Sequence, residues 1–524
     1  MRTVALAVAA LVVLTGCNSG GSASAVGDPL FADEWHLENT GQLGFIGVDL
    51  DVTRVWASGD RGAGTTIAVV DDGLEIGHED LRANVVPDLS YDYVTGGTDP
   101  TGGEHGTAVA GIIAERDDNG LGGRGVAPRA GLVGYNALYI ATDADLEDAM
   151  VRNAAAISVS NNSWGNPDGT GLLQGAPPKW QSYLDQGLAA GRGGRGTVYV
   201  WAAGNGASEY DGSVGKVVTV DNANYDGFAN AHGVIAVCST GSSGKRGVWT
   251  SGALAGFPYS EAGANLWVCA PGGDQDEGIT TTDRTGAAGY NGGHSATDYT
   301  NPDYTKDFEG TSAAAAMVSG VVALMLSANP SLGWRDVPII LARTARMTDS
   351  GDPGWRYNAA GYHYNSKYGF GLVDADQAVA LARKWTDVGA ERIWPTGASS
   401  PEKTIPDNNP TGVSDTITVA NSGISHVEWV AVTFRANDTH PGHLEVSLIH
   451  THGSTGTISR LAVPHDCPGA PCTSSPYSGW VFGDANFLGE PADGVWTLKV
   501  VDTHSGSTVD TGAFQSWRLK FYGH

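Results

Sequence analysis

The sequence predicts an α/β domain over residues 28–385, with a parallel sheet flanked by helices, followed by an all-β sandwich. Two apolar, β-branched runs at 66–70 and 197–203 lack a polar alternation, which is typical of buried parallel strands. The segment 156–160 has the same character. After residue 412 the pattern changes to short runs with a period of two, which indicates strands with one buried face.

Two apolar segments of the first domain, 106–114 and 312–328, indicate buried helices. The second is apolar enough to resemble a membrane span. It is too short for one, and Ser319 and Gly320 interrupt it. We therefore expect a central core helix at 312–328.

The second domain is predicted from three alternating runs, at 443–449, 495–501 and 517–522, with turn residues between them. A Pro- and Ser-rich stretch precedes them, and we expect a linker over 386–412. The sandwich is then expected over 413–524. Its histidines 426, 440, 443, 450 and 452 are predicted to lie on the surface, with a metal site as the alternative.

Composition is that of a folded protein rather than a disordered one. The 524 residues are 41% hydrophobic and 17% charged, which is enough for two or three domains with a large core. The formal net charge of −27 disfavours binding to nucleic acid. The 75 glycines indicate many tight turns.

The first 17 residues have the features of an export signal. Arg2 precedes an apolar run over 4–14, which is too short to span a membrane as a helix. The run ends in Leu14-Thr15-Gly16-Cys17, which resembles a bacterial lipobox and implies cleavage before Cys17 and its lipidation. An ordinary signal peptide with an incidental cysteine is the alternative. Residues 18–27 are rich in Gly, Ser and Ala and predict a flexible tether.

Four further cysteines, an even number in an exported protein, suggest two disulfides. Cys467 and Cys472 are close enough in sequence to form a tight loop, which would leave Cys238 with Cys269. Three connectivities are compatible with the sequence.

Three short segments carry residues for nucleophilic catalysis. Asp71 follows a predicted strand, and His105 and Ser312 each open a predicted helix. A serine hydroxyl needs a neighbouring base, and a buried carboxylate orients the histidine that supplies it. Taken alone, each residue fits a turn or a helix cap. Together, in the order Asp–His–Ser, they indicate a catalytic triad of the subtilisin order.

The surrounding motifs resemble the subtilisin superfamily and, within it, the kexin/furin-like proprotein convertases. The matching segments begin at Asp71, His105, Ser163, Ala203, Gly310 and Tyr368. The resemblance covers nearly all of 28–524. It implies a subtilisin-like serine endopeptidase domain followed by a jelly-roll-like P domain. It also implies that Asn205 donates to the oxyanion and that Ser163-Trp164-Gly165 forms one wall of the substrate cleft.

The same resemblance implies a preference for cleavage after Arg or Lys. Asp72, Asp168 and Asp226 match acidic residues of the family's substrate subsites, and carboxylates pair with basic side chains. One departure is Gly102, which stands where the family has a further acid. We therefore expect a looser requirement for a second basic residue.

Calcium is the ion that the resemblance implies, and hard cations take oxygen ligands. One expected site has side-chain ligands from Asp28, Asp80 and Asn119, with carbonyls from Arg116, Leu121 and Gly123. A second expected site is made of Asp168, Asp211 and Glu261.

The N-terminal region departs from kexin-like enzymes, because about ten residues separate Cys17 from Asp28 where those enzymes have a prodomain. We expect folding without a covalent prodomain and with a separate chaperone protein. The expected location is the cell envelope through a lipid anchor, with release outside the cell as the alternative.

Two other functions are weighed against a protease specific for basic residues. One is a subtilisin of broad specificity whose acidic pocket is not formed. The other is a surface-binding lipoprotein with a decayed protease fold, which the presence of Asp71, His105, Asn205 and Ser312 disfavours.

Overall fold

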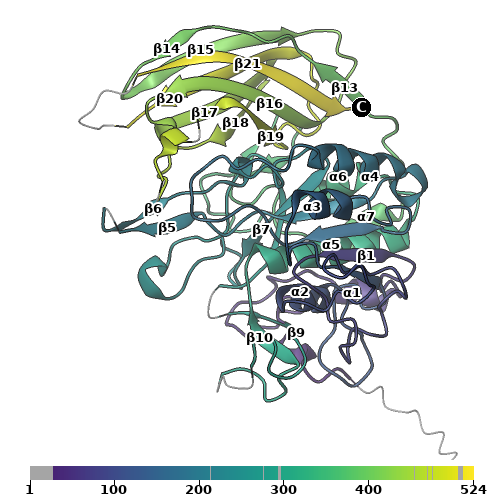
Figure 1. Cartoon of the computed structure of the whole chain (residues 1–524). Coiled ribbons are helices and arrows are strands. Elements are labelled where there is room, and N and C mark those ends of the chain that lie inside the picture. Colours follow the sequence, from purple (N-terminus) through teal and green to yellow (C-terminus); the bar gives the residue numbers. More distant parts are fainter. Residues whose placement is uncertain are drawn as a thin grey trace, which may run out of the picture.

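The computed structural model describes residues 27–212, 214–274, 277–292, 297–453, 455–468, 470–474, 476–504 and 511–524. The predicted signal peptide, its lipobox with Cys17 and most of the tether lie outside these residues. The described chain forms an α/β domain with a β-sandwich packed against it (Figure 1).

The first domain is built around a six-stranded parallel sheet in the order β2-β1-β3-β4-β7-β8. Its strands are β1 Thr66–Val70, β2 Gly131–Tyr135, β3 Val159–Asn162, β4 Val198–Ala202, β7 Val234–Thr240 and β8 Leu266–Pro271. The predicted strands at 66–70 and 197–203 are confirmed. The predicted run at 156–160 is shifted, because residues 151–156 form turns and the strand begins at Val159.

Helices cover both faces of this sheet because its strands are apolar on both sides. Ile67 and Val69 of β1 face one core cluster, and Ala68 and Val70 face the other. The first cluster includes residues of α1 Thr53–Ala57, α2 His105–Ala114, α5 Thr311–Ala328, α6 Asp336–Thr344 and α7 Ala375–Ala382. The second includes residues of α3 Asp143–Ala149 and α4 Trp180–Gly194.

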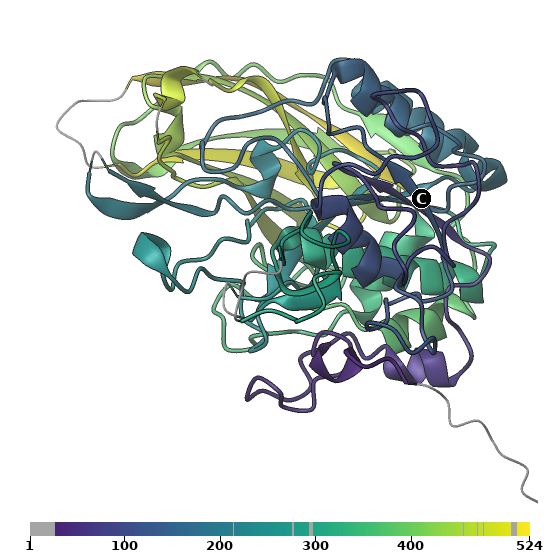
Figure 2. The same cartoon turned by 60° about the horizontal axis from the view of Figure 1, so that its bottom comes forward.

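Helix α5 is the central helix that the sequence predicts. Within the described residues it is the one helix long and apolar enough to cross a membrane, yet 89% of it is buried inside the protein. Figure 1 labels it among the other elements of the α/β domain, which Figure 2 shows turned by 60°. It is therefore the core helix of a folded domain, as predicted.

Short antiparallel pairs complete the first domain outside the main sheet. They join β5 Ser208–Asp211 to β6 Lys216–Thr219, β9 Ile279–Thr282 to β10 Tyr304–Phe308, and β11 Arg356–Tyr357 to β12 His363–Tyr364. The β5–β6 hairpin projects from the domain in Figure 1.

The second domain is a sandwich of two antiparallel sheets. One has the order β13-β21-β16-β19, with β14 also on β21, and the other has the order β15-β20-β17-β18. The strands are β13 Arg392–Pro395, β14 Lys403–Ile405, β15 Asn409–Val419, β16 Val427–Asp438, β17 Leu444–His452, β18 Thr455–Ala462, β19 Ser478–Asp484, β20 Gly494–Asp502 and β21 Gly512–Gly523.

The segment 386–412 differs from the predicted linker. It contains β13, β14 and the start of β15, so most of it belongs to the sandwich. β13 and β14 are mostly exposed, and β13 and the start of β15 carry prolines, so this sequence resembles that of a linker. The partners of β13 and β14 on β21 lie more than 100 residues away in sequence.

A buried ion pair joins the two domains. Arg335, next to α6, donates to both carboxylate oxygens of Glu428 on β16, at 2.7 and 2.5 Å. His524 contacts the same carboxylate at 2.6 Å. Trp267 of β8 also stacks against Trp429 of β16 across the boundary. The domains therefore share a packed interface.

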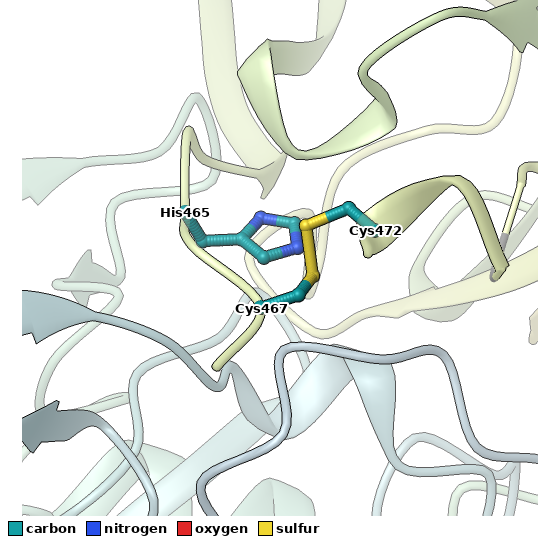
Figure 3. Close-up of side chains that lie close together, drawn as sticks. All are labelled: His465, Cys467 and Cys472. Atoms are coloured by element: carbon teal, nitrogen blue, oxygen red, sulfur yellow. A yellow bond between two sulfur atoms is a disulfide. The ribbon is translucent and has the colours of Figure 1, made fainter. Parts of the chain in front are cut away.

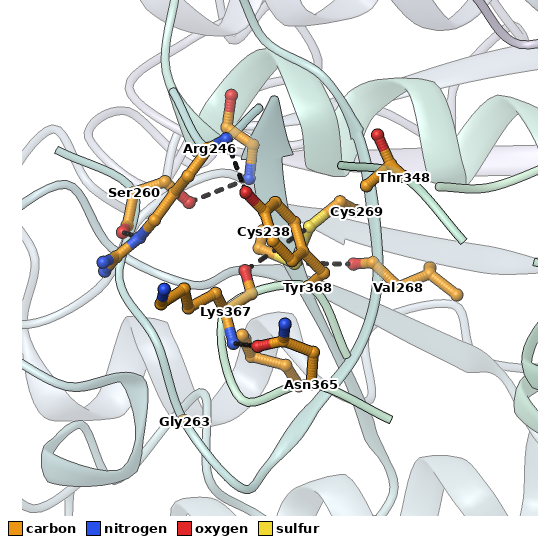
Figure 4. The surroundings of a disulfide bond; sticks show 12 residues. Cys238, Arg246, Ser260, Gly263, Val268, Cys269, Thr348, Asn365, Lys367 and Tyr368 are labelled. Carbon is orange, nitrogen blue, oxygen red and sulfur yellow. Dashed lines mark hydrogen bonds between the residues drawn. A yellow bond between two sulfur atoms is a disulfide. The ribbon is translucent and has the colours of Figure 1, made fainter. Parts of the chain in front are cut away.

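Both expected disulfides are confirmed. Cys238 and Cys269 are register partners on the neighbouring strands β7 and β8, and their bond lies beside Tyr368 in the core (Figure 4). Cys467 and Cys472 close a short loop after β18.

One histidine of the second domain contradicts the prediction of surface positions. His450 is 1% exposed, contacts Glu490 at 2.6 Å and stacks on Trp496. His426, His440 and His452 are exposed, as predicted. The buried carboxylate is the partner that lets His450 lie in the core.

Candidate active site

Asp71, His105 and Ser312 come from three different elements. Asp71 follows β1 at its carboxyl end, where ligand sites of open α/β sheets gather. His105 is the first residue of α2, and Ser312 is the second residue of α5. A glycine is required at position 106, where α2 approaches the segment after β1. A Cβ there would lie 2.8 Å from the Asp71 Cβ and would clash with the Gly73 carbonyl.

Asp71 and His105 form a close pair. The His105 Nδ1 lies 2.9 Å from the Asp71 Oδ1, and Asp71 is 1% exposed. Burial favours neutral His105, but the Asp71 carboxylate outweighs it, so the pKa of His105 is raised above its ordinary value. The carboxylate can therefore orient the ring and stabilise the imidazolium.

The Ser312 hydroxyl lies at the rim of a pocket. Its Oγ donates to the Ser163 carbonyl at 3.1 Å, and the Ser163 Oγ donates to the Ser312 carbonyl at 2.9 Å. The ring of Phe308, just before α5, packs against the ring of His105 at 5.2 Å. These contacts hold the start of α5 against both the end of β3 and the histidine.

Asn205 follows β4 and lies beside the start of α5. Its Oδ1 accepts from the backbone N–H and from the hydroxyl of Thr311, both at 2.9 Å. Asn205 also lines the pocket next to Ser312. Since the amide oxygen is engaged, the amide nitrogen is the group available as a donor toward the pocket.

The pocket has a volume of about 260 Å³, and Ser163, Trp164 and Gly165 line one side of it. Trp164 donates its indole N–H to the Val70 carbonyl at 3.0 Å. Its ring packs against Trp201 at 4.5 Å. This wall is therefore anchored to the strand that carries Asp71.

Asp226 also lines the pocket, next to Gly165 of that wall. Its carboxylate accepts backbone N–H groups from Asn166 at 2.7 Å, Phe228 at 2.6 Å and Ala229 at 3.2 Å. Burial raises its pKa to about 6 despite these bonds. A Cβ on Gly165 would lie 2.7 Å from the Asp226 Oδ2, so the glycine leaves the carboxylate accessible.

Asp72 occupies a different position from the other predicted substrate residues. Its oxygens accept the backbone N–H groups of His105 at 3.3 Å and Gly106 at 2.9 Å, so it caps α2. It is not among the residues that line the pocket. Burial, followed by the charge of Asp71, raises the pKa of Asp72 to about 6.

Gly102, the departure noted in the sequence, lies against Asp72. A Cβ there would be 2.4 Å from the Asp72 carbonyl oxygen and 3.3 Å from the Tyr139 ring. An acidic side chain therefore does not fit at this position without a change of the backbone.

Three carboxylates beside the pocket could hold a cation. Oxygens of Asp168, Asp221 and Glu261 all lie within 4.8 Å of one another. Burial raises the pKa of each, and the neighbouring acids raise those of Asp221 and Glu261 further. Glu261 is 3% exposed, and a bound cation would offset this repulsion.

This group differs from the predicted one in one residue. Asp211 was expected with Asp168 and Glu261, but it ends β5 and is not in the group, whose third acid is Asp221. The sequence reasoning missed that Asp221 begins the short segment that leads to Asp226. Asp221 and Asp226 belong to one short segment and both line the pocket, whereas Asp211 lies on the projecting β5–β6 hairpin.

The other predicted cation site is also brought together. Asp28 accepts the backbone N–H groups of Asp118 and Asn119, and Asn119 donates its amide to Asp80 at 2.5 Å. These contacts gather the loop that contains Arg116, Leu121 and Gly123, whose carbonyls were predicted as ligands.

Two buried acids beside this site were not predicted. Burial raises the pKa of Glu34 and of Glu115 well above their ordinary values, and the charge of Asp80 contributes to both. The Glu115 Oε2 has no hydrogen-bond partner among the described residues. Arg124 pairs with Asp28 at 2.7 Å. The surplus of buried negative charge fits a site for a hard cation.

Comparison with known proteins shows two matching family models. The subtilase family model matches residues 62–371, and the proprotein convertase P-domain model matches 427–521. The PC3-like endoprotease variant B of Hydra vulgaris is 32% identical over 491 residues, covering 91% of this chain and 63% of that protein. Neuroendocrine convertase 2 of Sus scrofa is 30% identical over 513 residues, covering 95% of this chain and 74% of that protein.

Furin-like protease 2 of Drosophila melanogaster is 29% identical over 513 residues, and this chain spans 28% of its length. The chain spans less than two thirds of the length of the Drosophila protein and of the Hydra protein. Among solved structures, the serine protease of Aeromonas sobria has a TM-score of 0.82 and 28% identity, covering 95% of this chain and 96% of that one. The same protease in complex with the chaperone ORF2 also has a TM-score of 0.82, with 27% identity over 95% of each chain.

Proposed function

Because the chain belongs to the subtilase family, in its kexin-like branch with a P domain, we propose that it is an exported serine endopeptidase that cleaves after Arg or Lys. One observation carries the proposal. The Asp71–His105 pair and Ser312 lie at the carboxyl edge of the sheet, and Ser312 lines a pocket whose acids include Asp226.

In the proposed reaction, Ser312 is the nucleophile and His105 the general base. The His105 Nε2 accepts the hydroxyl proton as the Ser312 Oγ bonds to the substrate carbonyl carbon. The proton then passes to the leaving amine as the peptide C–N bond breaks. Water hydrolyses the resulting acyl ester, with His105 again accepting and returning a proton. The Asn205 amide and the Ser312 backbone N–H stabilise the oxyanion.

The proposed specificity comes from the carboxylate of Asp226. A guanidinium or ammonium group in the pocket would pair with this carboxylate, which is already held by three backbone N–H groups. Asp168, on the adjacent side, adds negative charge. Since Gly102 leaves no acid beside Asp72, a second basic residue is recognised less strictly.

Calcium is the proposed ion, held by Asp168, Asp221 and Glu261 in one site. Asp28, Asp80 and Asn119, with carbonyls of the loop 116–123, would hold it in the other. The ion neutralises buried carboxylates and so stabilises the fold. Chelation is expected to lower the melting temperature, and Asp221→Asn is expected to reduce that response. A melting temperature that is unchanged by both chelator and added calcium would contradict the proposal.

The proposed location rests on the lipobox-like motif, with a lipid on Cys17. Mass spectrometry of the mature N-terminus tests it, with Cys17→Ala as the control. A chaperone partner is also proposed, because a similar protease forms a complex with one. Fully active enzyme from expression of this chain alone would contradict that partner.

A peptide-library cleavage profile tests the main proposal, with Ser312→Ala as the control. Cleavage after Arg and Lys that disappears in the variant is the expected result. Cleavage without preference would favour the broad-specificity alternative. No labelling of Ser312 by a fluorophosphonate would exclude a serine protease.

A further inference from the structure

One loop of the second domain contacts the substrate pocket of the first. The loop follows β18 and carries His465, whose Nε2 lies 2.9 Å from the Gly171 carbonyl. The next residue, Asp466, donates its backbone N–H to the Thr219 carbonyl at 3.0 Å. Gly171 lies between the pocket-lining residues Asp168 and Leu172, and Thr219 lies two residues before Asp221, where another pocket-lining segment begins. The loop therefore touches both segments.

A third contact reaches a residue of the pocket itself. Tyr225 lines the pocket next to Asp226 and is 2% exposed. Its hydroxyl lies 3.2 Å from the His465 Nδ1 and accepts the Val463 backbone N–H at 3.3 Å. The two rings pack at 4.7 Å between centroids. The His465 Nδ1 also lies 2.9 Å from the Val463 carbonyl of its own loop, and the tyrosine hydroxyl donates to that carbonyl at 3.2 Å.

The Cys467–Cys472 disulfide holds this loop in place (Figure 3). A Cβ on Gly171, whose φ is +67°, would lie 3.0 Å from the Cys467 Sγ and 2.3 Å from the Asp466 carbonyl oxygen. His465 and the two sulfurs lie within 4.8 Å, as metal ligands do. The sulfurs are bonded to each other, however, so neither is a thiolate that could bind a metal.

The contact is transmitted to the acidic cluster. The Gly171 backbone N–H donates to the Asp221 carboxylate at 2.6 Å, and Asp221 belongs to the proposed calcium site. Gly171 therefore contacts His465 through its carbonyl and Asp221 through its N–H. We propose that His465, held by the Cys467–Cys472 disulfide, is a positioning residue that keeps the pocket shaped for a basic side chain. This inference rests on the proposed function.

The physical reason is preorganisation. Without the imidazole donor, the carbonyl of Gly171 loses its partner at the domain boundary, and the segment that it belongs to can relax. Substrate then binds only the fraction of molecules with a formed pocket, which raises KM by the inverse of that fraction. The triad lies on other elements, so turnover of bound substrate is preserved.

The test compares His465→Leu with His465→Gln in the full chain. Leucine removes the donor, whereas the glutamine amide can donate to Gly171. On a peptide with Arg before the scissile bond, the leucine variant is expected to raise KM about 3- to 10-fold, the range of one hydrogen bond, with kcat within twofold. The glutamine variant is expected to recover most of the loss. His452→Leu, an exposed histidine of the same domain, is the matched control and is expected to leave KM unchanged.

The double variant Cys467→Ser with Cys472→Ser is expected to raise KM in the same direction. Ser312 labelling by a fluorophosphonate, which does not need the basic pocket, should proceed at the wild-type rate in all variants. An unchanged KM in both His465→Leu and the double serine variant would overturn the inference. So would a loss confined to melting temperature or to kcat. Failure of the wild-type protein to prefer Arg would instead contradict the proposed function.

Discussion

Replacing Asp226 by asparagine removes the charge in the pocket and nearly preserves the side chain's size. Removing one partner of a desolvated charge pair costs about 2–5 kcal/mol in binding, much of it from the charge that is left unpaired. At 1.36 kcal/mol for each factor of ten, kcat/KM for an Arg substrate should fall about 30- to 5000-fold. The kcat/KM for a substrate with leucine at the same position should change little.

The structure also predicts how this preference depends on pH. Because burial raises the pKa of Asp226 to about 6, its carboxylate in the free enzyme is ionised above that pH and becomes protonated below it. The ratio of kcat/KM for Arg over Leu should therefore fall as the pH is lowered through 6. Taking the ratio cancels the titration of His105, which affects both substrates. In Asp226→Asn the ratio should be low and independent of pH.

The assay uses two peptides that differ only in the residue before the scissile bond. Asparagine offers one acceptor oxygen to the three backbone N–H groups that Asp226 now binds, so folding must be checked by Ser312 labelling. Asp143→Asn, at the exposed start of α3, is the control for the change of net charge. An Arg-over-Leu ratio that is the same in Asp226→Asn and wild type would refute the assignment.

Three further substitutions test the proposed oxyanion donor, the proposed triad and the domain interface. Asn205→Ala should lower kcat about 10²- to 10³-fold with a small change in KM, and steady-state kinetics that show only a raised KM would count against an oxyanion role. Asp71→Asn should lower kcat on the order of 10⁴-fold and move the acid limb of the kcat/KM profile to lower pH, because Asp71 is the main group that raises the pKa of His105. Glu428→Gln removes the carboxylate that pairs twice with the buried Arg335, whose other acidic neighbour, Glu391, lies 4.0 Å away, and should cost about 3–5 kcal/mol in urea unfolding; an unchanged midpoint would show that the interface does not depend on this pair.

Much of the fold could be predicted from local patterns. The unbroken apolar run of β1 and the long apolar helix α5 each carry their own signal, because burial on all sides demands it. The edge strands β13 and β14 carry no such signal, since they are short and mostly exposed. Their assignment depends on β21, which follows them by more than 100 residues.

The residues of the candidate site could likewise be predicted only in part. Asp71, His105 and Ser312 stand at strand and helix boundaries, where the chain itself positions a side chain, and each could be named from its motif. Asp221 could not be told from Asp211 by residue type alone, since either acid offers the same ligand atoms. The choice between them was made by the fold of the segment that leads to Asp226.

By itself, therefore, the sequence determined the order of the domains, the positions of the three residues of the proposed triad, and the acids available to the pocket. The tertiary structure alone decided which acids meet, that His450 is buried against Glu490, and that His465 of the second domain contacts the pocket of the first. The physical reason is the range of the interactions. Periodicity and helix boundaries act within a few residues, whereas the contact between His465 and Gly171 joins positions 294 residues apart and leaves no local pattern.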